Sequence, residues 1–186
     1  MLAAGGSRRL GRPKQLVHIR GRSLLAHAVE RAVGLKPVWL GVVVGAGASR
    51  LVAALRASPV EVVRARRWRS GLSASLRAGI DRVPRRATHL LVTAVDQWAV
   101  TVADLDRLLR HPGRVPVAAA YEGIVGIPAL FPRHAWRALG RLEGDRGARR
   151  LLEASGTRAV PLAAAALDLD TPEDLRRLRA SWRRFP

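Results

Sequence analysis

The sequence predicts an α/β protein with a mostly parallel central sheet between two layers of helices, the three-layer α/β/α arrangement of Rossmann-like folds. Short apolar runs rich in β-branched residues alternate with amphipathic stretches along the chain, as in strand–helix–strand units. The run His89–Val95 is apolar almost throughout, as expected for a strand that helices cover on both faces. The 186 residues suit a single domain spanning positions 1–186.

Strands and helices are predicted in alternation. The predicted strands are Val38–Val44, Val60–Val63, His89–Val95, Val115–Tyr121 and Ile127–Phe131. Ser23 is a predicted N-cap for the amphipathic stretch after it, and Thr101 with Asp104 forms a capping box. Thr171–Asp174 begins a last helix, with threonine as the cap, proline at the first helical position and carboxylates near the positive end.

The composition limits the classes of function. There are 33 basic and 14 acidic side chains, and the net charge is +19. This charge is consistent with a polyanionic partner and also with a genome rich in arginine codons. The absence of cysteine excludes disulfides, thiolate metal sites and cysteine nucleophiles. No apolar run approaches the roughly 20 residues of a membrane span, so we expect no membrane partner and a cytoplasmic location.

The first segment, Leu2–Lys14, has the composition of an anion-binding loop. Small residues at Ala3–Gly6 let the backbone approach a bulky anion, and successive N–H groups in such a loop form an anion-binding concavity. Arg9 and Lys14 add positive charge that suits a triphosphate. The spacing of a P-loop is absent. A flexible basic N-terminus is the alternative interpretation.

The sequence LAAGGSRRLGRPK in this segment resembles the signature loop of the MobA- and MocA-like nucleotidyltransferases, most closely molybdenum cofactor cytidylyltransferase. The resemblance continues to about Leu178, with later motifs in the same order. It implies that the loop holds a nucleotide and that Arg9 and Lys14 are catalytic residues on its phosphates. The implied nucleotide-binding residues of the loop are Leu2, Ala3, Ala4, Gly5, Gly6, Ser7 and Lys14.

Two carboxylates are candidate ligands for Mg²⁺. Asp96 follows the predicted central strand, where a carboxylate can hold Mg²⁺ beside substrate phosphates. The alternative is a turn or capping aspartate, but the family has a metal-binding aspartate here, followed by a proline that Trp98 replaces. Alternation in an extended segment puts Asp168 and Asp170 on one side. We expect Asp170 to join Asp96 at the metal.

Three further segments resemble family motifs that contact the substrates. Residues 68–76 resemble a segment near the nucleotide base, and a Gly/Ser turn before a helix is the alternative. Residues 126–131 resemble a substrate strand in which Ile127 replaces a usual polar residue, and residues 144–149 match a glycine-rich anion site or a plain loop. The implied nucleotide-binding residues are Gly71, Ser73 and Ser75, and the implied substrate-binding residues are Gly126, Pro128, Gly144, Asp145, Gly147 and Arg149.

The resemblance implies Mg²⁺-dependent transfer of CMP from CTP to a phosphorylated acceptor such as molybdenum-molybdopterin, with release of pyrophosphate. Ala4 favours the cytidylyl over the guanylyl branch. A GTP-using guanylyltransferase, a sugar-phosphate nucleotidyltransferase and an accessory protein that has lost catalysis, suggested by Trp98 and Ile127, remain alternatives. A molybdoenzyme or its chaperone is a possible partner. Nucleic-acid binding is disfavoured, because the acidic residues repel phosphates unless a metal is bound.

The first strand is expected to be short. An anion-binding loop of this kind follows a buried strand of about five residues, but only Met1 and Leu2 precede Ala3. We therefore expect a truncated central strand whose neighbours have partly unpaired backbone groups. An apolar, β-branched run encoded upstream of Leu2 is the corresponding expectation.

Overall fold

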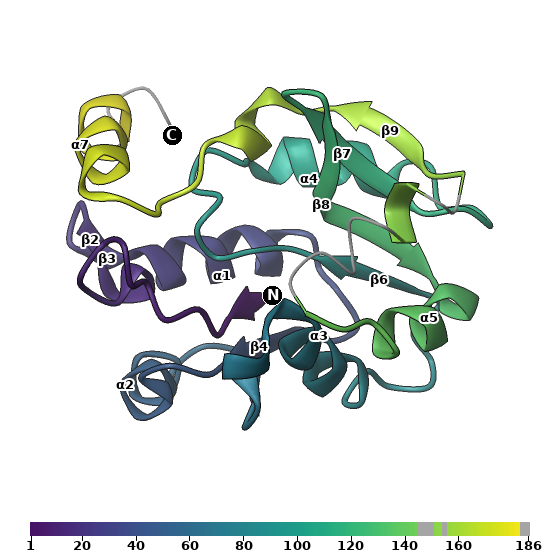
Figure 1. The fold of residues 1–186 in the computed structure, drawn as a ribbon, viewed down its shortest axis with the longest axis horizontal. Coiled ribbons are helices and arrows are strands. Elements are labelled where there is room, and N and C mark those ends of the chain that lie inside the picture. Colours follow the sequence, from purple (N-terminus) through teal and green to yellow (C-terminus); the bar gives the residue numbers. More distant parts are fainter. Residues whose placement is uncertain (145–150, 154–155, 183–186) are drawn as a thin grey trace.

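The computed structural model describes residues 1–144, 151–153 and 156–182. Its main sheet has two parts, β5–β4–β1 and β6–β8–β7–β9, which an isolated parallel bridge between Leu2 and Ala94 joins. Figure 1 shows β8, β7 and β9 beside β6. The strands are β1 (Leu2–Ala3), β4 (Gly41–Val44), β5 (Glu61–Arg64), β6 (His89–Val92), β7 (Val117–Tyr121), β8 (Ile124–Pro132) and β9 (Arg158–Pro161). Among these strands β8 alone runs against its neighbours, so the predicted mostly parallel sheet is confirmed.

The helices alternate with these strands. They are α1 (Leu24–Gly34), α2 (Ala48–Ala54), α3 (Leu72–Ile80), α4 (Val102–Leu109), α5 (Trp136–Gly140) and α7 (Pro172–Ser181). A small hairpin, β2 (His18–Ile19) and β3 (Arg22–Ser23), precedes α1. No helix of the described residues is long and apolar enough to cross a membrane.

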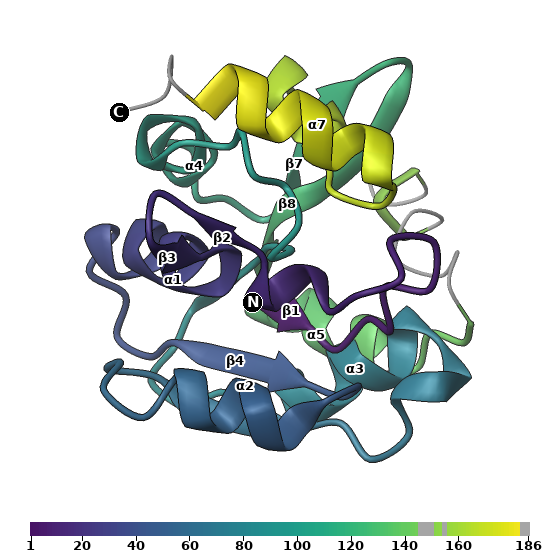
Figure 2. The same cartoon turned by 90° about the vertical axis from the view of Figure 1, so that its left-hand side faces the viewer.

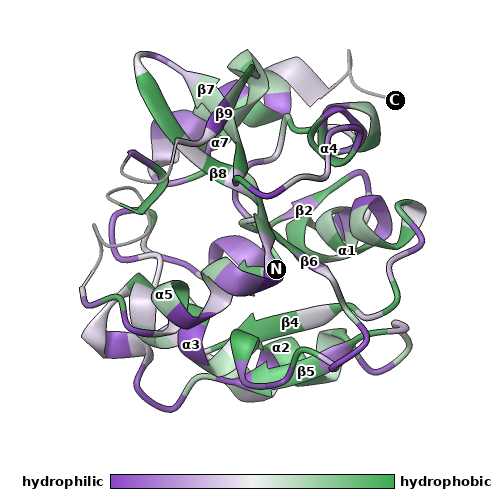
Figure 3. Cartoon of the chain, turned by 90° about the vertical axis from the view of Figure 1, so that its right-hand side faces the viewer, coloured by the Kyte–Doolittle hydropathy of each residue, from purple (hydrophilic) through white to green (hydrophobic). Residues whose placement is uncertain are grey.

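The two helical layers follow from alternation along β4. Val42 and Val44 lie in one apolar cluster with α1 and α2, whereas Val43 lies in a second cluster with α3 and α5. All three valines are almost completely buried, and full burial of such a side chain contributes about 1.5–3 kcal/mol. Figure 3 shows β4 and β5 as largely hydrophobic. The three-layer prediction is therefore confirmed.

The short β1 connects the two halves of the sheet. Leu2 and Ala3 pair in parallel with Val43 and Val44 on β4. On the other side the Leu2 N–H donates to the Thr93 carbonyl at 2.8 Å, and its carbonyl accepts from the Val95 N–H at 3.0 Å. The strand is as short as expected. An apolar cavity of about 220 Å³ adjoins Met1 and is lined by residues of both β4 and β6.

Three strands differ from the prediction. The predicted strand at Ile127–Phe131 is part of the longer β8, which forms a hairpin with β7 through Glu122 and Gly123, both at positive φ. β9 was not predicted, because its arginine, proline and largely exposed side chains lack an apolar pattern. The predicted strand from Val38 begins only at Gly41, and Val38 is 62% exposed.

The last helix, α7, forms as predicted. Thr171 accepts a hydrogen bond from the Asp174 N–H, Asp174 accepts from the Thr171 N–H, and Pro172 occupies the first turn. Its inner face, with Leu175 and Leu178, packs against the β2–β3 hairpin and the start of α1 (Figure 2). This packing fixes the segment just before α7 against the N-terminal loop.

Candidate active site

Four segments that are distant in the sequence meet at one cavity of about 520 Å³. They are the loop after β1, residues 68–75, the chain after β6 and the segment before α7. This volume is within the usual range for small-molecule sites. The lining residues are Leu2, Ala3, Ala4, Gly5, Gly6, Ser7, Arg8, Arg9, Lys14, Gln15, Trp68, Arg69, Gly71, Leu72, Ser75, Ala94, Val95, Asp96 and Asp170.

The loop after β1 is held in shape by its own side chains. Ser7 adopts a positive φ of 50°, and its hydroxyl accepts a hydrogen bond from the Lys14 N–H at 3.1 Å. The buried Gln15 donates to the carbonyls of Ala3 at 2.8 Å and Gly5 at 3.0 Å. Gln15 was missed in the sequence because its contacts are invisible without the fold. These bonds close the loop around the cavity.

The closed loop leaves backbone donors available for an anion. Within the described part of the chain, the N–H groups of Gly5, Gly6 and Ser7 donate no hydrogen bond. All three residues line the cavity. Successive free N–H groups of this kind bind phosphate-like anions. Anion binding by this loop therefore stays a prediction that its free N–H groups support.

The Trp68 ring packs against this loop at Gly6. A Cβ added to Gly6 would lie 3.3 Å from the Trp68 ring. One added to Gly45 would lie 2.6 Å from Trp68 and 2.8 Å from the Ala4 carbonyl oxygen, which no real side chain tolerates. Arg69 lies over the Trp68 ring with its guanidinium carbon 4.9 Å from the centroid. The two glycines thus allow the loop, Trp68 and the end of β4 to pack closely.

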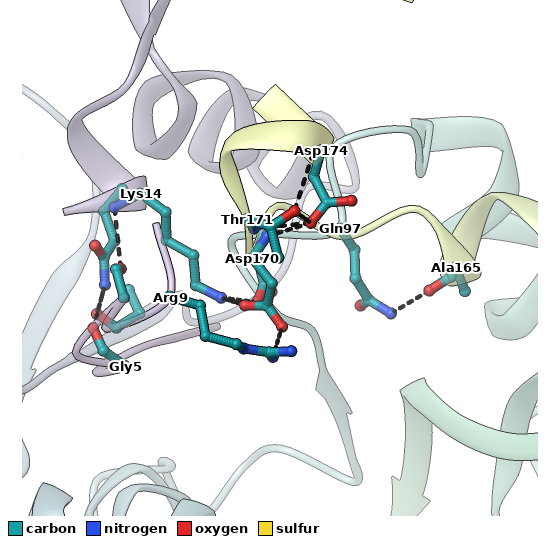
Figure 4. Close-up of polar contacts among 12 residues, drawn as sticks. Gly5, Arg9, Lys14, Gln97, Ala165, Asp170, Thr171 and Asp174 are labelled. Atoms are coloured by element: carbon teal, nitrogen blue, oxygen red, sulfur yellow. Dashed lines mark hydrogen bonds and ion pairs between the residues drawn. The ribbon is translucent and has the colours of Figure 1, made fainter. Parts of the chain in front are cut away.

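Two carboxylates and two cations form the charged centre of the cavity (Figure 4). The Lys14 ammonium donates hydrogen bonds to Asp96 and, at 2.7 Å, to Asp170. Arg9 forms an ion pair with Asp170 from the solvent side. Burial lowers the pKa of Lys14, but attraction and hydrogen bonds from Asp96 and Asp170 outweigh it, so the pKa is raised above its usual value. Lys14 is therefore a fixed positive charge at neutral pH.

Backbone contacts place the two carboxylates relative to each other. The Leu169 N–H donates to the Asp96 carbonyl at 3.1 Å, which ties the chain after β6 to the segment before α7. Next to it, the Gln97 amide nitrogen donates to the carbonyls of Ile127 at 2.8 Å and Ala165 at 3.1 Å. Gln97 thus links three segments around the site, a role that sequence motifs alone did not indicate.

Asp168 lies near this centre without joining it. Partial burial and repulsion by Asp170 and Asp96 raise its pKa. Asp168 does not line the cavity. Among the described residues no group of three His, Cys, Asp or Glu side chains could hold a metal ion. The carboxylate pair Asp96 and Asp170 nevertheless suits Mg²⁺, which takes one or two carboxylates and completes its shell with phosphates and water.

The remaining predicted contact residues are only partly gathered here. Gly71 and Ser75 line the cavity, but Ser73 is buried away from it. Gly126 and Pro128 lie on β8 and do not line it, and the Gly144 carbonyl accepts a hydrogen bond from the Ser73 N–H at 3.2 Å. Asp145, Gly147 and Arg149 lie outside the described residues.

The fold and cavity are those of an α/β protein in which a glycine-rich loop and a carboxylate pair line one cavity. More specifically, the chain belongs to the family described as the MobA-like NTP transferase domain, whose model matches residues 1–160. It is thus a member of a nucleotidyltransferase family, as the resemblance in the sequence implied.

Known relatives cover most of the chain. The nicotine blue oxidoreductase of Paenarthrobacter nicotinovorans is 34% identical over 163 residues, which are 82% of this chain and 79% of that protein. The structure of Rv0371c from Mycobacterium tuberculosis H37Rv is 34% identical and covers 97% of this chain and 95% of its own, with a TM-score of 0.86. A second Rv0371c structure, in complex with manganese, is 31% identical with a TM-score of 0.82 and covers 97% and 96%.

A cap residue is expected to position Asp170. The Asp174 carboxylate accepts from the N–H groups of Asp170 at 3.1 Å and Thr171 at 2.8 Å. Burial raises the pKa of Asp174, but the bonds from Thr171 and Asp170 outweigh it, so the pKa lies below its usual value. The matching stabilisation is present above the unfolded pKa of about 4 and is lost as the pH falls through the lower folded pKa.

Replacing Asp174 by asparagine should therefore lower the free energy of unfolding by about 1 kcal/mol at pH 7, as loss of a helix cap does. The difference from the wild type should shrink below about pH 4. Urea unfolding at pH 7 and pH 3 measures both values. Glu173→Gln is the matched control, since Glu173 is 74% exposed and forms a surface ion pair with Arg176. A cost for Asp174→Asn that is equal at both pH values would contradict the assigned role.

Proposed function

We propose that this protein transfers a nucleotidyl group from a nucleoside triphosphate to a phosphorylated acceptor and releases pyrophosphate. The observation that carries the proposal is the convergence of Lys14, Asp96 and Asp170 at one point of a cavity. The same cavity is lined by Gly5–Ser7, whose N–H groups donate no hydrogen bond within the described residues. Such an arrangement can hold the phosphates of a nucleotide beside a metal-binding carboxylate pair.

The chain's own residues would act by positioning and charge. The N–H groups of Gly5–Ser7 and the side chains of Arg9 and Lys14 would bind the triphosphate. An oxygen of the acceptor phosphate would then attack the α-phosphorus. The bond from that phosphorus to the bridging oxygen breaks, and pyrophosphate leaves with the electron pair. No general base is required, because the acceptor phosphate is already ionised.

Mg²⁺ is the proposed cofactor. Asp96 and Asp170 fit a divalent cation, since their carboxylates already share one cationic atom, Lys14 Nζ. The manganese complex of Rv0371c supports dependence on a divalent metal in this family. When bound, Mg²⁺ would supply charge neutralisation and orientation of the α-phosphate.

The proposed donor is CTP and the proposed acceptor is a molybdopterin-type phosphate, with a molybdoenzyme or its chaperone as a possible recipient. The donor assignment depends on Ala4, which lines the cavity. Pyrophosphate release should be measured with molybdenum cofactor and each of CTP, GTP, ATP and UTP. We expect CTP to be preferred by about 10-fold or more, the discrimination typical of a site that hydrogen-bonds one substrate and not its analogues. A preference for GTP would favour a guanylyltransferase. Activity with sugar phosphates as acceptors would favour a sugar-phosphate nucleotidyltransferase.

Two other interpretations give different results in that assay. A nucleotide-binding accessory protein would bind nucleotide without releasing pyrophosphate. Trp98, which suggested it, is buried with its ring 6.2 Å from that of Trp182, so packing explains this residue. The Paenarthrobacter relative has the name of an oxidoreductase, and an activity of that class would also leave every nucleotide uncleaved.

A further inference from the structure

One position at the centre of the cavity is a shared binding point for cations. The Lys14 ammonium bonds to both Asp96 and Asp170, and it lies 2.7 Å from the latter's Oδ1. Its side chain is only 10% exposed, so the ammonium is largely shielded from solvent. The two carboxylates are thus bridged by the same atom that a divalent ion bound between them would have to displace.

A divalent ion and Lys14 cannot occupy this position together. Mg²⁺ binds carboxylate oxygens at about 2.0–2.1 Å, and an ammonium already within hydrogen-bonding distance of both carboxylates leaves no room for it. Their charges also repel strongly at such a short separation. With Arg9 on Asp170, the cluster is electrically balanced by protein groups alone. Entry of the metal therefore requires Lys14 to leave.

The structure also provides a second place for the ammonium. The Lys14 stem passes beside Gly5, where an added Cβ would lie 4.0 Å from Lys14 Cε. Gly5–Ser7, whose N–H groups make no hydrogen bond within the described residues, line the same cavity. A phosphate bound to them would attract the flexible lysine away from the carboxylates.

We propose that the Lys14 ammonium and the divalent cation are alternative occupants of one site, so that nucleotide phosphates open the metal position by drawing Lys14 onto themselves. This inference rests on the proposed function. It makes tight metal binding a consequence of nucleotide binding, and it keeps the free protein from holding the metal firmly. The affinity for metal alone is then limited by competition with Lys14.

Mn²⁺ binding without nucleotide tests this competition. The free Mn²⁺ remaining in titrations at pH 7.5 can be measured by electron paramagnetic resonance for the wild type, Lys14→Met and Lys36→Met. We expect Lys14→Met to bind Mn²⁺ at least about 10-fold more tightly than the wild type, because an ion-paired competitor is removed. Lys36, the chain's other lysine, is exposed, and its variant controls for the loss of one positive charge. Adding Asp96→Asn to Lys14→Met should abolish the gain.

A second measurement covers the stability of the variant. Mn²⁺ should raise the Tm of Lys14→Met more than that of the wild type, as any ligand specific for the folded state does. Lys14→Gln replaces the methionine variant if the latter does not unfold cooperatively. Equal or weaker Mn²⁺ binding by the Lys14 variant overturns the exchange. That result leaves pyrophosphate release by the wild type unaffected, whereas absence of release with every nucleotide would overturn the proposed function alone.

Discussion

Asp96→Asn is expected to lower kcat/KM for pyrophosphate release by about 10³-fold or more, within the range for loss of a central electrostatic group. The variant keeps the shape of the side chain but removes the charge that holds Lys14 and would hold the metal. The fold should survive, because Lys14 keeps Asp170 as a partner and the Asp96 carbonyl still accepts from Leu169. We expect a loss of about 1–2 kcal/mol in the free energy of unfolding, typical of one charged hydrogen bond.

Steady-state assays of pyrophosphate release and urea unfolding of the same preparations check the two parts of this expectation. Asp81→Asn is the control, since Asp81 is exposed at the end of α3 and does not line the cavity. It should retain activity. Normal turnover by Asp96→Asn would contradict the proposed mechanism. A variant that fails to unfold cooperatively would show that Asp96 is required mainly for the stability of the fold.

Sequence reasoning found the parts of the fold that local physics determines. Val42–Val44 are buried on both faces, and His89–Val92 are partly or fully buried, so both segments carry continuous apolar runs that identify them as strands. The caps at Ser23, Thr101 and Thr171 are formed by neighbouring residues and were also predicted. β9 lacks such a signal, because its pairing with β7 and not its own side chains makes it a strand.

The candidate site shows the same division. The loop after β1 and the position of Asp96 could be predicted, because the spacing of small, basic and acidic residues is local. Gln15 and Gln97 could not, because their contacts join segments up to 68 residues apart. The bridging of Asp96 and Asp170 by Lys14 was also unforeseen, because Lys14 was assigned to phosphate and the two carboxylates to metal, and only the fold shows that one ammonium bonds to both carboxylates.

Asp96 and Asp170 should act as one unit, and this is the second large effect that we expect. Asp170→Asn alone should lower kcat/KM by about 10²-fold, since Asp170 bonds to the same ammonium from the other side and also to Arg9. If both carboxylates hold one cation, losing either already destroys the site. The double variant should then be about 10³-fold impaired, close to Asp96→Asn alone, and not about 10⁵-fold as independent effects predict.

A double-mutant cycle on kcat/KM measures this coupling. Asp168→Asn provides the matched comparison, because Asp168 lies two residues from Asp170. The Asp168 carboxylate is repelled by Asp96 and Asp170 but does not line the cavity. It should change turnover little, and its effect should add to that of Asp96→Asn. Multiplicative losses in the Asp96 and Asp170 pair would mean that the two carboxylates serve different cations, and the shared position occupied by Lys14 would then not be the metal site.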